Sequence, residues 1–167
     1  TVNLVAVDSR FDLGSPEDEI SKDGYLSQIL MHRPCFLFNH STIGVQMPFV
    51  KQGEVDLFEK LYFDACRLGE FNADFKIAEP LLRNADIMSL DLQSIRSSDF
   101  QGDHYTSPNG FYAEQICQIV RYAGISDKLT SFGIFNHLPG NISEASSHLV
   151  AQIIWYFLDG IAQRKGD

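Results

Sequence analysis

The sequence predicts an α/β fold of three layers, helix–sheet–helix, with a mainly parallel β-sheet. Short apolar runs alternate along the chain with segments of helical period, which is the order that parallel sheets require. The apolar runs are nearly continuous, as expected for strands that are covered on both faces. With 167 residues, 44% of them hydrophobic, the chain can bury a substantial core, and we expect one domain over residues 1–167.

Five apolar runs are candidates for the strands of this sheet. Four of them are strong candidates, and the fifth is weaker. The strong candidates are VNLVAV (Val2–Val7), CFLFN (Cys35–Asn39), DIMSLDL (Asp86–Leu92) and SFGIFN (Ser131–Asn136), and the weaker one is IGVQM (Ile43–Met47).

Three segments of helical period lie in the first half of the chain. GYLSQILMH (24–32) stops shortly before a proline. VDLFEKLYFDACRLG (55–69) carries an apolar stripe and ends at a glycine, which favours a helix C-terminus there. In ADFKIAEPLLRNA (73–85), Pro80 must either start a new helix or kink this one.

Two further helices are expected in the second half. GFYAEQICQIVRYAG (110–124) follows a Pro-Asn-Gly turn signal. The last helix follows Ser143, a candidate N-cap, and repeats apolar residues at helical spacing from Leu149 to Ile161. The polar segment Ser97–Asn109 is predicted to be a long loop, and long loops in compact domains are often functional.

Composition and charge exclude several classes of protein. The chain has 13 basic and 22 acidic residues, a formal net charge of −9, which argues against binding to nucleic acid or to an anionic membrane. The three cysteines are far apart and form no CxxC pair, which favours reduced thiols and a cytoplasmic location. The chain shows no signal peptide or membrane-length apolar run. It begins with Thr1 and enters a strand at once, which favours a fragment or a processed chain.

Polar side chains follow three of the predicted strands. In open parallel sheets, ligands bind beyond the carboxyl ends of the strands, so these side chains could meet in one site. They are Asp8, Arg10 and Asp12 after the first strand, Asp91 and Gln93 in and after the third, and Asn136 and His137 after the fourth. Taken locally, they could equally be a surface ion cluster and structural loop residues. The other histidines, His32, His40, His104 and His148, show no metal-ligand spacing and are interpreted as structural or exposed.

Four segments give the sequence a resemblance to a known family, the ureohydrolases, which comprise arginases, agmatinases and formimidoylglutamases. VDSRFD (7–12) resembles the family's Asp-x-His-x-Asp metal motif, and SLDLQSI (89–95) resembles its Ser-x-Asp-x-Asp motif. SPNGFYAEQICQI (107–119) is similar to the Pro-Gly-Gly segment and the helix after it. SFGIFNHLP (131–139) lies where the family carries a glutamate before Asn-Pro.

YFDACRLGE (62–70) and WYFLDGIAQRK (155–165) resemble the formimidoylglutamase branch in particular. The resemblance implies the later part of an arginase-like fold, because the family's earlier glycine-rich strand end, with another metal-binding histidine, has no counterpart here.

The resemblance implies metal-assisted hydrolysis, in which two manganese ions share a bridging hydroxide that attacks a guanidine or amidine carbon. Asp8, Asp12 and Asp91 match metal-ligand positions. Arg10 stands at a histidine ligand position and Gln93 at an aspartate ligand position. Arginine offers no lone pair to a metal, so we expect manganese at one site rather than two, or none. An alternative is that the guanidinium of Arg10 replaces the missing cation among the carboxylates.

Substrate binding is expected near Asn136 and His137, because Asn136 falls near the family's substrate-binding glutamate. The resemblance leaves two functions open. The first is hydrolysis of linear C–N bonds in formimidoyl or guanidino substrates, for example formimidoylglutamate. The second is an inactive homologue that acts as a binding or assembly protein. An unrelated α/β ligand-binding domain is a third interpretation. A chain that lacks early strands would expose a sheet edge, so we also expect a homo-oligomer or association with a missing N-terminal segment.

Overall fold

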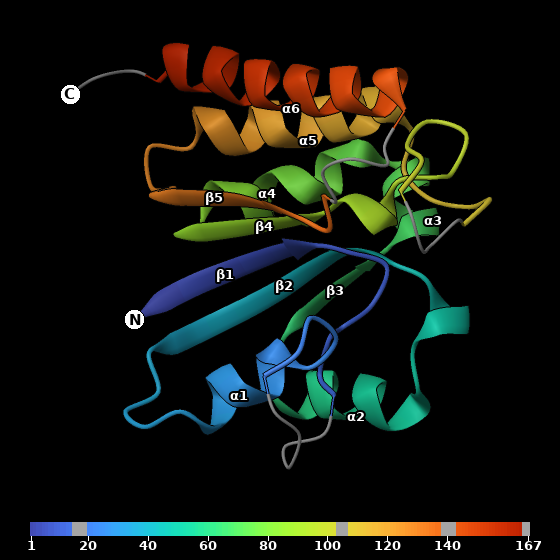
Figure 1. Cartoon of the computed structure of the whole chain (residues 1–167). Helices are drawn as coiled ribbons and strands as arrows, with labels where there is room; N and C mark the ends of the chain where they lie inside the picture. The colour runs from blue at the N-terminus through green and yellow to red at the C-terminus, as the bar shows by residue number, and fades with distance from the viewer. Residues whose placement is uncertain (15–19, 103–106, 138–142, 165–167) are drawn as a thin grey trace.

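A computed structural model of the chain contains one five-stranded sheet, and every neighbouring pair of strands is parallel (Figure 1). The structure describes residues 1–14, 20–102, 107–137 and 143–164. The strand order is β3-β2-β1-β4-β5. The strands are β1 (Val2–Val7), β2 (Leu37–Val45), β3 (Asp64–Arg67), β4 (Ile87–Asp91) and β5 (Ser131–Phe135).

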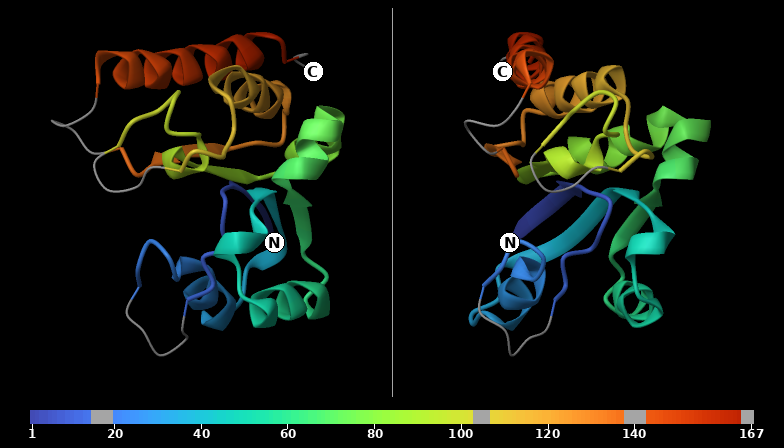
Figure 2. Two further views of the ribbon diagram at one scale, coloured as in Figure 1. Left: turned by 90° about the vertical axis from the view of Figure 1, so that its right-hand side faces the viewer. Right: turned by 45° about the vertical axis from the view of Figure 1, so that its right-hand side comes forward.

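The helices lie on both sides of this sheet, as predicted (Figures 1 and 2). α1 and α2 lie on one side, and α4, α5 and α6 lie on the other (Figure 2). The helices are α1 (Tyr25–Met31), α2 (Gln52–Lys60), α3 (Leu68–Ala73), α4 (Ala78–Arg83), α5 (Ala113–Ile125) and α6 (Glu144–Ala162), with short 3₁₀ turns η1 (Met47–Phe49), η2 (Phe75–Ile77) and η3 (Leu92–Ser94). None of the helices in the described ranges is both long enough and apolar enough to cross a membrane.

Each side of the sheet has its own buried cluster, because successive strand residues point to opposite faces. The larger cluster joins the odd-numbered side of β1, at Val5 and Val7, to α4, α5 and α6. The smaller cluster lies under α1 and α2 and contains Phe11, Leu26 and Phe58. His40 is buried on this side and contacts Phe58 edge to face.

The predicted strands are confirmed with one rearrangement. Residues 2–7, 87–91 and 131–135 form β1, β4 and β5 as expected. The strong candidate Cys35–Asn39 and the weaker candidate Ile43–Met47 contribute to one longer strand, β2. Ser143 caps α6 by accepting a hydrogen bond from the backbone N–H of Ser146 at 3.1 Å, and Pro80 lies in the first turn of a new helix, α4.

The helix predicted over residues 55–69 is wrong. It is divided into α2, the edge strand β3 and the start of α3. Tyr62 adopts a left-handed conformation (φ 57°) just after α2, and this conformation ends the helix. β3 is then held by pairing with β2, including a hydrogen bond from the Ser41 hydroxyl to Asp64 at 3.2 Å. Contacts with a distant strand therefore override the local helical pattern.

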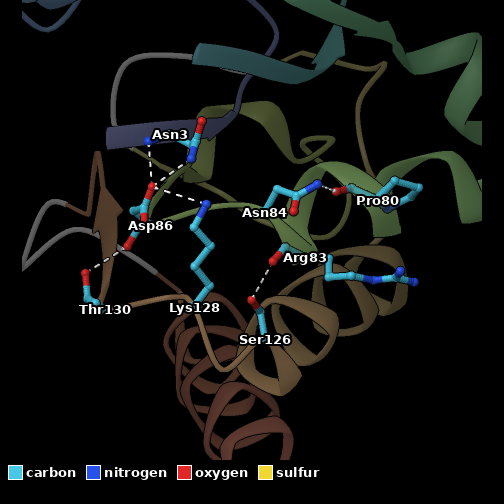
Figure 3. A network of polar contacts seen from close by, with 8 residues as sticks. All are labelled: Asn3, Pro80, Arg83, Asn84, Asp86, Ser126, Lys128 and Thr130. Atoms are coloured by element: carbon cyan, nitrogen blue, oxygen red, sulfur yellow. Dashed lines mark hydrogen bonds and ion pairs between the residues drawn. The ribbon is translucent and has the colours of Figure 1, made fainter. Parts of the chain in front are cut away.

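Asp86 fixes the start of β4 against β1 and β5 (Figure 3). Its carboxylate accepts hydrogen bonds from the backbone N–H of Asn3 at 2.7 Å and from the side-chain amide of Asn3 at 2.9 Å. The ammonium group of Lys128 lies 3.8 Å away, and the Thr130 hydroxyl donates to the Asp86 carbonyl at 2.9 Å. The backbone hydrogen bond from Asn3 is the main reason that the pKa of Asp86 lies below its usual value.

We predict that Asp86→Ala lowers the free energy of unfolding by about 1–3 kcal/mol, because both donors of Asn3 lose their charged acceptor. Urea denaturation followed by circular dichroism measures the change. The matched control is Asp127→Ala at an exposed aspartate. Equal stability of the two variants would contradict the prediction.

Candidate carboxylate site at the strand ends

Three neighbouring strands deliver polar side chains to one end of the sheet. Asp8 directly follows β1, Asp91 is the last residue of β4, and Asn136 directly follows β5. Because β1, β4 and β5 are adjacent and parallel, their carboxyl ends lie side by side. These three residues and Asp12 line one cavity of about 900 Å³. The structure therefore brings together the three aspartates that the sequence analysis singled out.

Asp8 and Asp12 form the deepest part of this group. Both are buried, and their side chains hydrogen-bond to each other. The Oδ1 atom of Asp8 also accepts the backbone N–H of Arg10 at 2.9 Å. Asp12 adopts a left-handed backbone conformation (φ 50°), which turns the chain sharply after the strand. This local turn lets two aspartates four residues apart face the same cavity.

Asp91 is held from two sides. Its Oδ1 atom accepts the backbone N–H of Gln93 at 2.7 Å, and its Oδ2 atom accepts the side-chain amide of Asn136 at 2.7 Å. Asn136 also has a left-handed conformation (φ 60°). Asn136 thus orients a carboxylate of the site, and Gln93 contributes its backbone N–H to the same purpose.

Burial and mutual repulsion make this site hold protons. The pKa of Asp8 lies well above its usual value because of burial first and the charges of Asp12 and Asp91 next. Burial also raises the pKa of Asp12 from 3.8 to about 7, although the hydrogen bond with Asp8 opposes the rise. A positively charged ligand would relieve this repulsion.

The positive charge of Arg10 offsets the carboxylates only in part. Its guanidinium carbon lies 5.5 Å from the centre of the Phe49 ring. The positive charge of Arg10 lowers the pKa of Asp12, but this effect is smaller than the rise caused by burial. The hypothesis that Arg10 replaces a lost cation stays a proposal, and the electrostatic balance offers it little support.

The remaining candidates lie away from the carboxylates. His137 is exposed and is not among the residues that line the described part of the cavity. His148 is exposed, and His104 lies outside the described residues. His32 follows α1, is exposed and lines the cavity. Its Nδ1 atom lies 3.2 Å from the Pro34 carbonyl oxygen.

Sequence reasoning missed two residues of this site, Tyr25 and Ser89. Both line the cavity. Burial and the nearby aspartates raise the pKa of Tyr25 well above its usual value, so the phenol remains a donor. The sequence showed Tyr25 only as the start of a helix, and no pattern distinguished Ser89 from other strand residues.

The loop before α1 brings Tyr25 to the carboxylates. Gly14 has a positive φ of 54°, and a Cβ atom at this position would lie 2.6 Å from the Cα atom of Gly24. This close approach returns the chain to the strand end, where the backbone N–H of Leu26 donates to the Asp12 carbonyl at 3.2 Å. The first turn of α1 is therefore attached directly to the backbone of a site aspartate.

Away from the carboxylates the cavity is mostly apolar. It follows the face of β1, β4 and β5 on the α1 side, past Leu4, Ile87 and Phe135. Phe135 and Ile87 are 55% and 37% exposed. This part of the sheet face has no covering helix within the described ranges, whereas α1 and α2 cover the β1–β2–β3 part.

The donor set does not fit a two-manganese centre. Residues in the described ranges contain no group of three or more His, Cys, Asp or Glu side chains arranged to hold a metal ion. Arg10, which stands at a ligand position of the resemblance, offers no lone pair to a metal. The carboxylates supply negative charge without the coordination geometry that manganese requires.

Comparison with known proteins identifies the fold. No protein-family model and no curated protein matches the chain. Among solved structures, it is similar to Trypanosoma cruzi formiminoglutamase with Mn²⁺, with a TM-score of 0.87 at 16% identity over 98% of this chain and 58% of that chain. It is similar to Bacillus subtilis formimidoylglutamase, with a TM-score of 0.85 at 14% identity over 99% of this chain and 55% of that chain.

Entamoeba histolytica arginase in complex with L-ornithine is also similar, with a TM-score of 0.75 at 17% identity over 94% of this chain and 60% of that chain. The chain thus spans between half and two thirds of the length of these proteins. It has part of the ureohydrolase fold, as the sequence motifs predicted.

We predict that Asp12→Asn stabilises the chain at pH 8 and has little effect at pH 4. Folding raises the pKa of the Asp12 carboxyl group from 3.8 to about 7. The folded chain is therefore destabilised as the pH rises between these two values, because the buried group must then lose its proton. At pH 8 the penalty removed by the amide is at most about 4 kcal/mol. Denaturation at both pH values measures it.

The exposed Asp127→Asn variant removes the same charge from the surface and serves as the control. A destabilised Asp12→Asn variant at pH 8 would show that the Asp12 carboxylate is compensated in the folded chain.

Proposed function

We propose that the chain is a ureohydrolase-fold protein whose strand-end carboxylates bind a small organic cation of the amidine or guanidine class, and that it lacks a two-manganese hydrolytic centre. The observation that carries this proposal is the convergence of Asp8, Asp12 and Asp91 in one cavity, with the pKa values of Asp8 and Asp12 raised. It makes the chain a binding protein of the inactive-homologue type that the sequence left open.

An amidinium or guanidinium ion suits this pocket for two physical reasons. Its N–H donors lie in one plane and can each meet a different carboxylate oxygen, so they make charge-assisted hydrogen bonds. Its charge is delocalised and weakly hydrated, so it leaves water at lower cost than an ammonium or a divalent metal. Binding would allow Asp8 and Asp12 to ionise together, which their mutual repulsion opposes in the free chain.

A second candidate is metal-dependent hydrolysis of linear C–N bonds. The similarity to structures named formiminoglutamase and arginase favours it. The donor set of residues 1–167 lacks the histidine that the resemblance expects at Arg10, so a manganese site, one rather than two, would need a ligand from outside this sequence. The predicted cytoplasmic location and the absence of a nucleic-acid partner stay predictions.

We predict that isothermal titration detects guanidinium or acetamidinium binding to the chain at concentrations far below those that denature it. Asp91→Asn should weaken this binding about tenfold or more, because a charged hydrogen bond contributes about 1.5–3 kcal/mol. Asp127→Asn, at the surface, should leave the affinity unchanged.

Metal analysis of the same preparation and an assay for formamide or urea release with added Mn²⁺ separate the two candidates. Two tightly bound manganese ions, or turnover that requires manganese, would overturn the binding proposal. An equal affinity of the wild-type chain and Asp91→Asn for guanidinium would overturn it as well.

We also propose that a polypeptide from outside residues 1–167 covers the free edge of β5. Among the described residues, β5 pairs only with β4, and the sheet face beside it exposes Ile87 and Phe135. On the helix α6 side, Ile154, Trp155 and Leu158 are 46%, 60% and 55% exposed. A second copy joined edge to edge about a two-fold axis normal to the sheet would cover the edge but leave both bare faces open. A segment that adds a strand beside β5 and a further element over the exposed apolar side chains would cover both the edge and the faces.

Hydrogen exchange tests this association. We expect the backbone amides of β5 to exchange rapidly in residues 1–167 alone and slowly when the chain is expressed with its flanking coding sequence. β3, the other edge of the sheet, serves as the internal control and should not change. Concentration-dependent protection of β5 in residues 1–167 alone would instead assign the edge to a second copy.

A further inference from the structure

The cavity is layered along the strands, because paired residues of parallel strands share a face. The outermost layer on the α1 side is formed by Asp91 of β4, which pairs with Phe135 of β5. One step inward, Ser89 pairs with Ala6 on one side and with Gly133 on the other. This second layer contains only small side chains across three neighbouring strands, and the ring of Phe135 lies over it at Gly133.

Tyr25 lines the cavity beside this layer. The same cavity is lined by Asp8, Asp12 and Asp91 and by Ser89, the central residue of the small layer. Ser89 lies one step inward of Asp91 on the same face of β4. Leu4 and Ile87, which pair with each other one step further inward, line the apolar part of the cavity.

The position of Tyr25 is fixed by backbone contacts. Leu26 donates its N–H to the carbonyl of Asp12 at 3.2 Å, and the Ser27 hydroxyl donates to the carbonyl of Leu13. Both residues follow Tyr25 in the first turn of α1. The ring and the Asp12 carboxylate are thus carried by two segments that are hydrogen-bonded to each other, and their separation is set by the fold.

We propose that Tyr25 is the specificity-determining residue of the carboxylate pocket, where its ring forms the floor and selects a planar organic cation over a hydrated divalent metal. The inference rests on the proposed function, because it assigns to one residue the preference for an organic cation over a metal ion. An aromatic face attracts a delocalised cation, whereas a hydrated divalent ion needs further oxygen ligands, and a ring supplies none.

The test compares the affinities of the chain for guanidinium and for Mn²⁺ in three variants. Tyr25→Leu removes the ring, Tyr25→Phe keeps the ring and removes the hydroxyl, and Tyr62→Phe is the matched control at a tyrosine that is 89% exposed. Tyr25→Leu should weaken guanidinium binding about two- to thirtyfold, the range of a cation–π contact. Tyr25→Phe should retain most of the affinity, and the control all of it. Mn²⁺ affinity should stay the same or rise in Tyr25→Leu.

A spectroscopic readout separates a direct contact from a structural effect. Guanidinium should perturb the ultraviolet absorption of tyrosine in the wild-type chain and in Tyr62→Phe, and the perturbation should disappear in Tyr25→Phe. Near-identical guanidinium affinity of wild type and Tyr25→Leu would overturn the inference while leaving the proposed function intact. Equal losses for guanidinium and Mn²⁺ would assign Tyr25 a structural role and also overturn it. A wild-type chain that binds no guanidinium would overturn both.

Discussion

The electrostatic repulsion among three carboxyl groups withdrawn from water is the constraint on which the site depends. Asp8 and Asp12 are buried, and Asp91 adds a third negative charge to the same cavity. The chain compensates in part with backbone and amide N–H groups, which donate to Asp8 and to both oxygens of Asp91. These dipoles orient the carboxylates but leave the pKa values of Asp8 and Asp12 raised. The folded chain therefore maintains a binding potential for a cation.

The parallel sheet creates this constraint, and the loops determine its geometry. Parallel strands place the ends of β1, β4 and β5 together, so any acidic residues after them meet. Left-handed residues then redirect the chain at two of the ends, Asp12 after β1 and Asn136 after β5. Charge concentration thus follows from topology, whereas the orientation of each carboxylate follows from one or two local hydrogen bonds.

Much of the architecture, and the meeting of the aspartates, could be predicted because both follow from periodicity and strand order. β3 could not be predicted, because Asp64–Arg67 lies inside a stretch with a helical apolar stripe and is held by pairing with β2. The hydrogen bond from the Asn136 amide to Asp91 could not be predicted either, because it joins two distant segments, and the substrate-binding role of Asn136 stays a prediction. Tyr25 was missed because its place in the site arises from the Gly14–Gly24 contact and from the hydrogen bond between Leu26 and Asp12, and neither leaves a pattern in the sequence.

The two kinds of cation make different demands on a pocket, and the proposed function rests on this difference. A manganese ion needs negative charge together with lone pairs directed at one point, including imidazole or further carboxylate donors. Arg10 and Gln93 remove two such donors at the positions that the resemblance assigns to ligands, while the carboxyl groups of Asp8, Asp12 and Asp91 are retained. A planar amidinium or guanidinium ion carries its own directed donors and needs only acceptors around its edge and a flat surface against its face. In the proposed function, the carboxylates provide the edge and Tyr25 provides the face, so a pocket without metal ligands at these two positions would still be chemically selective.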